Sequence, residues 1–349
     1  MHDSGALPKS ARVTNGDISF LGEGIGMLGD LARVRLTYTP PTAGPASLIV
    51  KMPTTHDANR ERGLAFAFYE REARLYELFG RTGRTGGLRI PRCYAAPMDL
   101  EAQRFALLIE DLDATGFKPA DQVAGLQPDQ AHLAVEQLAR FHAEWWEKVD
   151  VGELQWLPYS NSEVTKQAAG IMRGNWVLFA ERFGDCLSED ALELGPRVGA
   201  RYEELLDNLA SPPRTIVHTD YRLDNLFFPA AGSADAPMAV VDWQLTTRGR
   251  GVYDVAYLLG QSMDPALRAR HEHEVLRTWH GALTAAGVDG YSVDDALDDC
   301  RLGALINLVI PVSLADMDAG NDRGVELVRS VAERAFRAAV EIDAARILA

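Results

Sequence analysis

Three polar residues within residues 216–228 have side chains that could move a proton and bind a metal ion. The stretch reads IVHTDYRLDNLFF, and His218, Asp220 and Asn225 occur in it with the spacing H-x-D-x-x-x-x-N. An ordinary hairpin turn would use the same residue types, because Asp and Asn bond to their own backbone and tolerate tight conformations. A catalytic loop held between two strands is the alternative, and the rest of the chain has to decide between them.

A second acid follows the next apolar run. Residues 226–228 and 238–241 are expected to be strands joined by the turn PAAGSADAP, with Asn225 and Asp242 at their outer ends. The two outer ends of a hairpin lie at the same edge, so the amide and the carboxylate are expected to meet there. Oxygen donors of this hard type suit Mg²⁺.

A lysine and a glutamate earlier in the chain add a possible ion pair. Lys51 ends the apolar run of residues 48–50, where a solvent-facing lysine would be the simplest interpretation. Glu72, however, lies in the middle of an apolar stripe at helical spacing. A buried carboxylate needs a cationic partner, and Lys51 is the natural candidate. Glu70 lies off this stripe, although a small rotation of the helix would exchange the two acids. The stripe consists of Ala65, Phe68, Tyr69, Leu75, Tyr76 and Phe79.

A glycine-rich segment, FLGEGIGMLGDL, contains Gly22, Gly24 and Gly26. A dinucleotide-binding turn requires a helix directly after the glycines, whereas here the alternation of residues 31–39 predicts a strand. Glycines between two strands can lie over nucleotide phosphates, because the missing side chains let backbone N–H groups approach.

The hydrophobic periodicity predicts an α+β fold with two lobes. The N-terminal lobe, residues 1–112, is expected to be an antiparallel sheet with one main helix, and the C-terminal lobe, residues 113–349, to be mainly helical. The expected elements are strands 31–39, 47–52 and 105–109, a helix 59–79, and helices from 128–149 to 324–349.

Composition limits the partners of the protein. The chain has 349 residues, of which 47% are hydrophobic, and its net charge is -15. This negative charge argues against sequence-independent binding to DNA or RNA, which requires a basic surface. No signal pattern and no run long enough for a membrane span is found, so a soluble cytoplasmic protein is expected. The cysteines at 93, 186 and 300 are odd in number, without a C-x-x-C pair, and are expected to be buried, reduced thiols.

The chain resembles small-molecule phosphotransferases in the order of its motifs: the glycine loop, the lysine, the glutamate, the polar loop and the final acid. These are the aminoglycoside phosphotransferase and choline kinase group, which has a protein-kinase-like fold. The segment VVDWQLTTRGRGVYDVAYLLG is most similar to the ecdysteroid-kinase-like branch. The resemblance covers nearly the whole chain and implies an ATP- and Mg²⁺-dependent kinase acting on a hydroxyl of a small molecule. A nucleotide-binding pseudokinase that acts as a binding module is the alternative.

The resemblance also implies roles for single residues. Asp220 matches the catalytic aspartate, which orients the acceptor hydroxyl and takes its proton, while Asn225 and Asp242 match the two Mg²⁺ ligands. Lys51, held by Glu72, would contact the nucleotide phosphates.

Further implied roles concern the nucleotide and the loop. Gly22, Gly24 and Gly26 would cover the phosphates, and the backbone of Glu110 to Leu112 would bind adenine. His218 is expected to support the loop, and Asp254 matches an aspartate that holds it.

Departures from protein kinases favour a small acceptor. Thr219 replaces the arginine before the catalytic aspartate, Trp243 and Gln244 follow Asp242, and an Ala-Pro-Glu segment is absent from the sequence. Aminoglycosides, choline-like amines, sugars, steroids and other alcohols are all acceptors in the group, and the sequence does not choose among them.

Overall fold

The computed structural model describes residues 1–2, 5–21, 28–41, 43–230, 237–316 and 322–349, which form two compact units. The sheet unit contains residues 1–85, 89–119 and 227–245, and the helical unit contains residues 86–88, 120–226 and 246–349. The boundary expected at residue 112 therefore lies inside the sheet unit. The segment 227–245 also belongs to that unit, because its strands pair with residues near 118 rather than with the helices.

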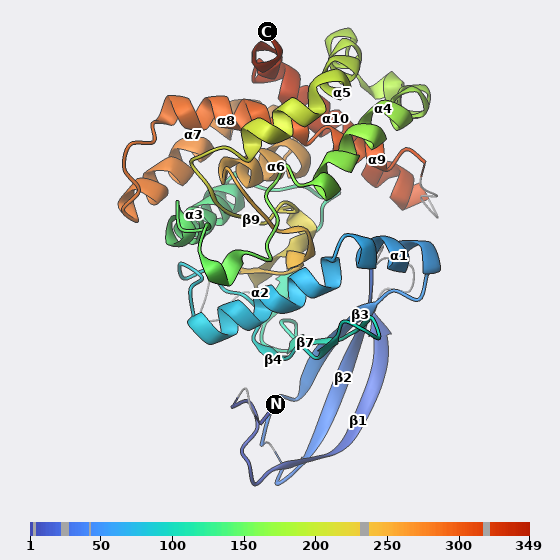
Figure 1. The fold of residues 1–349 in the computed structure, drawn as a ribbon, viewed down its shortest axis with the longest axis vertical. Coiled ribbons are helices and arrows are strands. Elements are labelled where there is room, and N and C mark those ends of the chain that lie inside the picture. Colours follow the sequence, from blue (N-terminus) through green and yellow to red (C-terminus); the bar gives the residue numbers. More distant parts are fainter. Residues whose placement is uncertain (3–4, 22–27, 42, 231–236, 317–321) are drawn as a thin grey trace. The chain divides into compact units, whose positions relative to one another are not determined.

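The sheet unit is built on a five-stranded antiparallel sheet (Figure 1). Its order is β1-β2-β3-β7-β4, so the strands expected at 31–39 and 47–52 are neighbours, paired from Gly29↔Pro53 to Arg35↔Ser47. The strand expected at 105–109 is split into β6 and β7. The bounds are β1 Arg12–Leu21, β2 Gly29–Thr39, β3 Ser47–Pro53, β4 Cys93–Ala95, β5 Met98–Asp99, β6 Arg104–Phe105 and β7 Leu107–Glu110.

Two helices, α1 (Asp57–Ala65) and α2 (Phe68–Thr82), replace the single helix expected at 59–79. The break occurs at Ala67, whose φ of 53° is left-handed. Alanine favours helices, so packing overrides its local preference. Tyr69 lies against Gly63, where a Cβ atom would be 2.6 Å from the tyrosine ring. The apolar phase of α2 is nevertheless as expected: the predicted stripe is buried along α2, and only Ala65, which ends α1, is exposed.

The polar loop leads into a second, three-stranded sheet of order β11-β10-β8. The strands are β8 (Phe117–Pro119), β10 (Leu226–Pro229) and β11 (Ala239–Val240). β10 and β11 are adjacent, which confirms the expected hairpin, and β10 pairs with β8 from Phe227↔Pro119 to Pro229↔Phe117.

The helical unit packs around α6, which is buried at all its positions. α6 contacts α8 and α10, while α3 lies against α7 and α4 against α5 (Figure 1). The helices expected at 128–149 and 324–349 end early: Trp146 terminates α3, and Asp343, with a φ of 56°, follows α10. The bounds are α3 Pro128–Trp145, α4 Glu163–Phe183, α5 Glu189–Leu209, α6 Val252–Ser262, α7 Pro265–Ala285, α8 Val293–Ile306, α9 Val309–Ser313 and α10 Asp322–Glu341, with the strand pair β9 Thr215–Val217 and β12 Thr247–Gly249.

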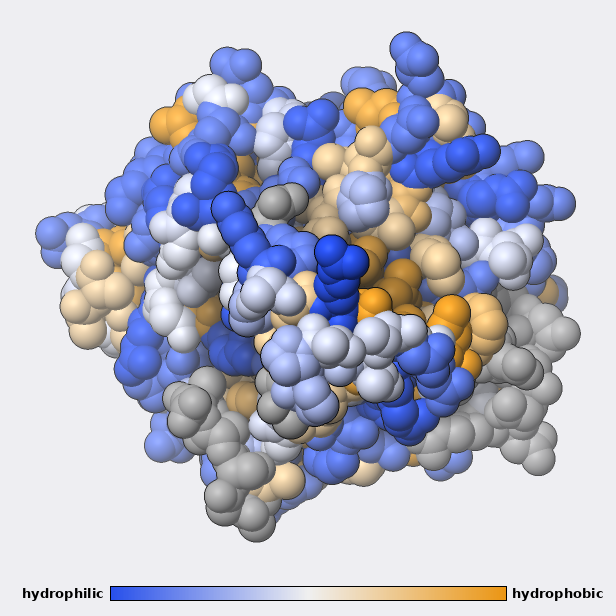
Figure 2. Space-filling model, turned by 90° about the horizontal axis from the view of Figure 1, so that it is seen from below, coloured by the Kyte–Doolittle hydropathy of each residue, from blue (hydrophilic) through white to orange (hydrophobic). Residues whose placement is uncertain are grey.

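The surface mixes hydrophilic and hydrophobic residues, and in Figure 2 the hydrophobic ones gather in part of one face. On the edge strand β1, the side chains of Val13, Ile18 and Phe20 are exposed. Among the described residues, no helix combines the length and apolar character that a membrane span requires. All three cysteines are free, but only Cys300 is buried; Cys93 and Cys186 are half-buried, which corrects the expectation for them.

Candidate active site

The predicted lysine pair forms in the sheet unit and includes a third residue. The Nζ atom of Lys51 on β3 lies 2.8 Å from Glu72 Oε2 on α2 and 2.8 Å from Asp242 Oδ1. The side chains of Lys51 and Glu72 are 12% and 5% exposed, so this ion pair is largely removed from water. Three residues that are far apart in the sequence therefore converge on one ammonium group.

Electrostatics favours the charged form of this lysine. Burial by itself lowers the pKa of Lys51, but Asp242 and Glu72 outweigh it and hold the pKa above its ordinary value. Burial raises the pKa of the Glu72 carboxyl; Lys51 opposes this shift and Asp242 adds to it. Two carboxyl groups therefore contact one ammonium group, and both favour its charged form.

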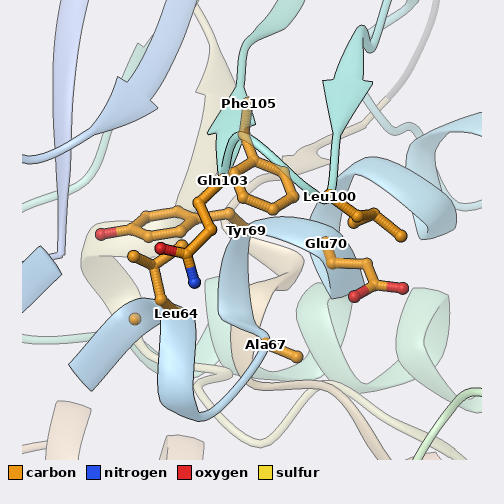
Figure 3. Close-up of a pocket in the computed structure, with 8 residues that line it drawn as sticks. Leu64, Ala67, Tyr69, Glu70, Leu100, Gln103 and Phe105 are labelled. Carbon is orange, nitrogen blue, oxygen red and sulfur yellow. The ribbon is translucent and has the colours of Figure 1, made fainter. Parts of the chain in front are cut away.

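The choice between the two acids of α2 is settled by this geometry. Glu70 pairs with Arg74 at 2.7 Å, four residues further along the helix, whereas Glu72 pairs with Lys51. Glu70 also lines a cavity of about 160 Å³ between the α1–α2 junction and the β5–β6 hairpin, beside Tyr69 and Phe105 (Figure 3). Lys51 and its two partners do not line that cavity.

Replacing Glu72 by glutamine is expected to lower the free energy of unfolding by about 2 kcal/mol or more. Removing one partner of a buried ion pair is strongly destabilising, and here Asp242 still compensates part of the lysine charge. Chemical denaturation measures the effect.

Glu70→Gln is the matched control, because it removes a carboxylate of the same helix from a partly exposed pair. Such i,i+4 pairs contribute about 0.3–0.5 kcal/mol. Equal effects of the two substitutions would contradict the assignment of Glu72 as the buried partner.

The loop after Asp242 is anchored to α2. Asp242 has a φ of 65°, which costs energy for a residue other than glycine and therefore needs support. Trp243 is fully buried and its ring meets Phe79 edge to face at 5.1 Å. Arg71 donates to the carbonyl of Gln244 at 3.3 Å, and burial lowers its pKa to about 10. This role of Arg71 was not anticipated from the sequence.

The expected adenine-binding segment lies at the end of β7. The Glu110 carboxylate accepts two hydrogen bonds from Arg89, at 2.5 and 2.7 Å, and another from the backbone N–H of Arg92. Burial raises its pKa, but the hydrogen bonds from Arg89, Arg92 and Thr115 and the charge of Arg89 together outweigh burial, so the pKa is lowered. The carbonyl of Leu112 accepts from the backbone N–H groups of Thr115 and Phe117 in a turn. Gly22, Gly24 and Gly26 lie outside the described residues.

In the helical unit the loop of residues 218–225 places its acid and its amide side by side. A short 3₁₀ helix, Leu223–Asn225, turns Asn225 back so that its Nδ2 donates to the Oδ2 atom and to the backbone carbonyl of Asp220, each at 2.9 Å. The other carboxylate oxygen, Oδ1, accepts from the Tyr257 hydroxyl at 2.9 Å and lies 3.5 Å from Arg222 Nε. Tyr257 was not anticipated from the sequence.

Asp254 holds the backbone of this loop. Its carboxylate accepts from the backbone N–H groups of His218, at 2.8 Å, and Thr219, at 2.9 Å. Thr219 has a φ of 65°, and these two bonds fix the peptide groups around the strained residue. His218 is fully buried and its Nδ1 accepts from the backbone N–H of Asp220 at 3.3 Å. Both residues therefore have the supporting positions expected of them.

A buried chain of hydrogen bonds orients Asp254 in turn. Trp279 Nε1 donates to His142 Nδ1 at 3.2 Å, so that ring nitrogen acts as an acceptor. The proton is then on Nε2, which lies 3.2 Å from Asp254 Oδ2 and donates to it. His142 is thus a satisfied core histidine, as the sequence indicated. Gly251 makes room for it, since a Cβ there would be 2.7 Å from the imidazole.

The other polar residues of the loop have separate surroundings. Tyr221 is fully buried and donates to the carbonyl of Ala134 at 3.0 Å, so it anchors the loop to α3. Asp224 accepts from Gln122 N–H and from Arg222, each at 3.0 Å. Of these three residues, Arg222 is the one beside the Asp220 carboxylate.

No group of three or more His, Cys, Asp or Glu side chains suited to a metal ion occurs within the described ranges. Such a group is not needed by a Mg²⁺ site in which phosphate oxygens complete the ligand set of one or two side chains.

Solved structures of small-molecule kinases share this fold over nearly the whole chain. A choline kinase from Cryptosporidium parvum Iowa II has a TM-score of 0.54 and 8% identity, and covers 99% of this chain and 94% of its own. Plasmodium vivax ethanolamine kinase has a TM-score of 0.51 and 12% identity, and the match covers 91% of this chain and 82% of the kinase. The GDP complex of an aminoglycoside 2'-phosphotransferase-IIIa mutant has a TM-score of 0.54 and 16% identity, with 94% and 95% covered. These likenesses confirm the α+β, protein-kinase-like fold.

The sequence comparisons identify the family. No sequence among the curated proteins matches the chain. The model of the ecdysteroid kinase-like family matches residues 23–287, which include every site residue described above except Gly22. The chain therefore belongs to the ecdysteroid kinase-like family.

Proposed function

We propose that this protein is a small-molecule kinase that transfers the γ-phosphoryl group of ATP to a hydroxyl group, with Mg²⁺ as cofactor. The convergence of Lys51, Glu72 and Asp242, with both ion pairs at 2.8 Å, is the observation that carries the proposal. Phosphoryl transfer needs a fixed cation for the phosphates and a carboxylate for the metal, and this cluster supplies both in one place.

The donor chemistry of the two proposed Mg²⁺ ligands fits the ion. Asn225 uses its Nδ2 on Asp220, which turns its amide oxygen to another direction. The Asp242 carboxylate accepts from Lys51 at Oδ1 and from Gln244 Nε2 at Oδ2, which leaves further lone pairs on both oxygens. Both offer hard oxygen atoms of the kind that Mg²⁺ prefers. That each of these side chains binds Mg²⁺ stays a prediction.

Bound Mg²⁺ would neutralise charge that grows on the phosphate oxygens, and the side chains would do the rest. Lys51, kept charged by its two acids, would bind phosphate oxygens once a nucleotide arrives. Asp220, held at both carboxylate oxygens, would orient the acceptor hydroxyl and take its proton. Little covalent chemistry is asked of the protein, because the transfer depends on placement and charge.

Support for a small acceptor comes from the family and from the fold. The family is named for ecdysteroid kinase-like proteins, and the similar structures include kinases of choline and ethanolamine. A pseudokinase is the competing function, but a degenerate site would be expected to have lost part of the set. Lys51, Asp220, Asn225 and Asp242 are all retained.

A screen for ATP consumption tests the proposal. The purified protein with Mg²⁺ and ATP is incubated with a panel of aminoglycosides, amino alcohols, sugars, steroids and other alcohols. We expect one chemical class to raise ATP consumption well above background and to yield a phosphorylated product detected by mass spectrometry. ATP binding with Mg²⁺ and no transfer to any member would favour the binding module instead.

A further inference from the structure

Tyr257 lies in the segment that carries the family resemblance, where it was assigned no role, yet it contacts the central acid. It is on α6, is 2% exposed, and its hydroxyl donates to Asp220 Oδ1 at 2.9 Å. Burial raises the pKa of the phenol well above 10, and Asp220 adds to the shift, so the hydroxyl stays protonated and remains a donor. The tyrosine therefore cannot serve as a base at ordinary pH.

The contact fixes the carboxylate from the side opposite Asn225. Asn225 holds Oδ2 and Tyr257 holds Oδ1, each at 2.9 Å, so rotation of the carboxylate about its Cβ–Cγ bond would break both hydrogen bonds. The nearby groups of the helical unit are Arg222, at 3.5 Å from Oδ1, and the phenol of Tyr253. A carboxylate has about four lone-pair positions, so a fixed carboxylate can still accept a bond from a substrate hydroxyl.

The helix that carries Tyr257 also carries Asp254, three residues earlier and therefore on the same helical face. Asp254 sets the loop backbone through the N–H groups of His218 and Thr219. α6 is buried along its whole length, which makes it a rigid support. One helix thus positions both the backbone of the loop and the side chain of its acid.

We propose that Tyr257 is a positioning residue for phosphoryl transfer: its hydroxyl orients the Asp220 carboxylate toward the acceptor hydroxyl. This inference rests on the proposed kinase function. Misplacing a catalytic group by about 1 Å can slow such a reaction about a hundredfold, because only near-attack geometries react.

Tyr257→Phe removes the hydroxyl and keeps the ring. With the acceptor found in the screen, kcat is expected to fall about tenfold or more, which corresponds to one hydrogen bond to a charged group. The KM for ATP is expected to stay within twofold, because the nucleotide-binding residues are unchanged. Tyr202→Phe is the matched control: it removes the hydroxyl of an equally buried tyrosine of the helical unit that donates to the carbonyl of Ile306, and its kcat should stay within twofold of the parent. Equal rates in the two variants would overturn the proposal.

A double-mutant cycle on stability tests the bond without any substrate. Urea unfolding is measured for the parent, Tyr257→Phe, Asp220→Ala and the double variant. In the parent background Tyr257→Phe should raise the unfolding equilibrium constant about tenfold, whereas with Asp220→Ala the hydroxyl has already lost its partner and the effect should vanish. Additive effects would overturn the proposal whatever the acceptor is. If the two substitutions are coupled but the screen finds no turnover, the Tyr257–Asp220 hydrogen bond exists, and the proposed kinase function and the positioning role that depends on it are both wrong.

Discussion

Asp220→Ala is expected to reduce phosphoryl transfer by about 10²–10⁴-fold, the contribution that a positioned general base makes. The carboxylate is the group that would accept the hydroxyl proton, and alanine offers no acceptor in its place. Nucleotide binding should be largely kept, because Lys51, Glu72 and Asp242 belong to the sheet unit. Steady-state kinetics with the identified acceptor measures the loss, and isothermal titration calorimetry measures the nucleotide affinity.

Two further variants separate the loss of the base from damage to the loop. Asp220→Asn keeps the shape and one hydrogen-bond acceptor for Tyr257, yet cannot take a proton, so its rate should be nearly as low. Asp224→Asn alters an acid of the same loop that bonds to Gln122 and Arg222, and it should retain most of the activity. If Asp220→Ala left the rate within a few-fold of the parent, Asp220 would not be the base.

Asp242→Asn is expected to weaken Mg²⁺-dependent nucleotide binding by about a hundredfold, since a charge-assisted contact contributes about 1.5–3 kcal/mol. Asparagine keeps the size of the side chain but removes the negative charge that would hold the metal. Calorimetric titrations of ATP with and without Mg²⁺ measure the effect, and the difference between the two conditions should nearly disappear.

The structure adds a control for this second variant. Asp242 also bonds to Lys51, so its substitution leaves Glu72 as the partner of the lysine. The Mg²⁺-free affinity and the melting temperature therefore have to be compared with those of Glu72→Gln, which disturbs the same lysine from its other side. A titration showing unchanged affinity in the presence of Mg²⁺ would contradict the metal-ligand assignment.

The local periodicity of the sequence predicted much of the fold and part of the candidate site. The alternation of residues 31–39 places β2, and the helical stripe around Glu72 gives the correct buried phase of α2 although the helix begins later than expected. The reason is that buried side chains recur every two residues in a strand and every three to four residues in a helix, so the sequence shows which face is buried. The same phase favoured Glu72 over Glu70 as the partner of Lys51.

Such patterns did not predict the break between α1 and α2, nor that the β10–β11 hairpin belongs to the sheet unit. Ala67 has a strong helical preference, yet its conformation is left-handed, and the neighbouring Tyr69 packs against Gly63. The segment 227–245 joins the sheet unit because β10 pairs with β8, which is about a hundred residues earlier in the chain. Neither fact follows from the residues nearby in sequence.

The sequence by itself determined the fold class, the order of the site residues and their chemical types, because motifs and periodicity are local properties of the chain. Only the tertiary structure decided that Lys51 bonds to Glu72 and Asp242 together, that Tyr221 is a buried anchor, and that Tyr257 bonds to Asp220. These contacts join residues as much as 191 positions apart. Their geometry depends on the packing of whole helices and strands, which no short stretch of sequence contains.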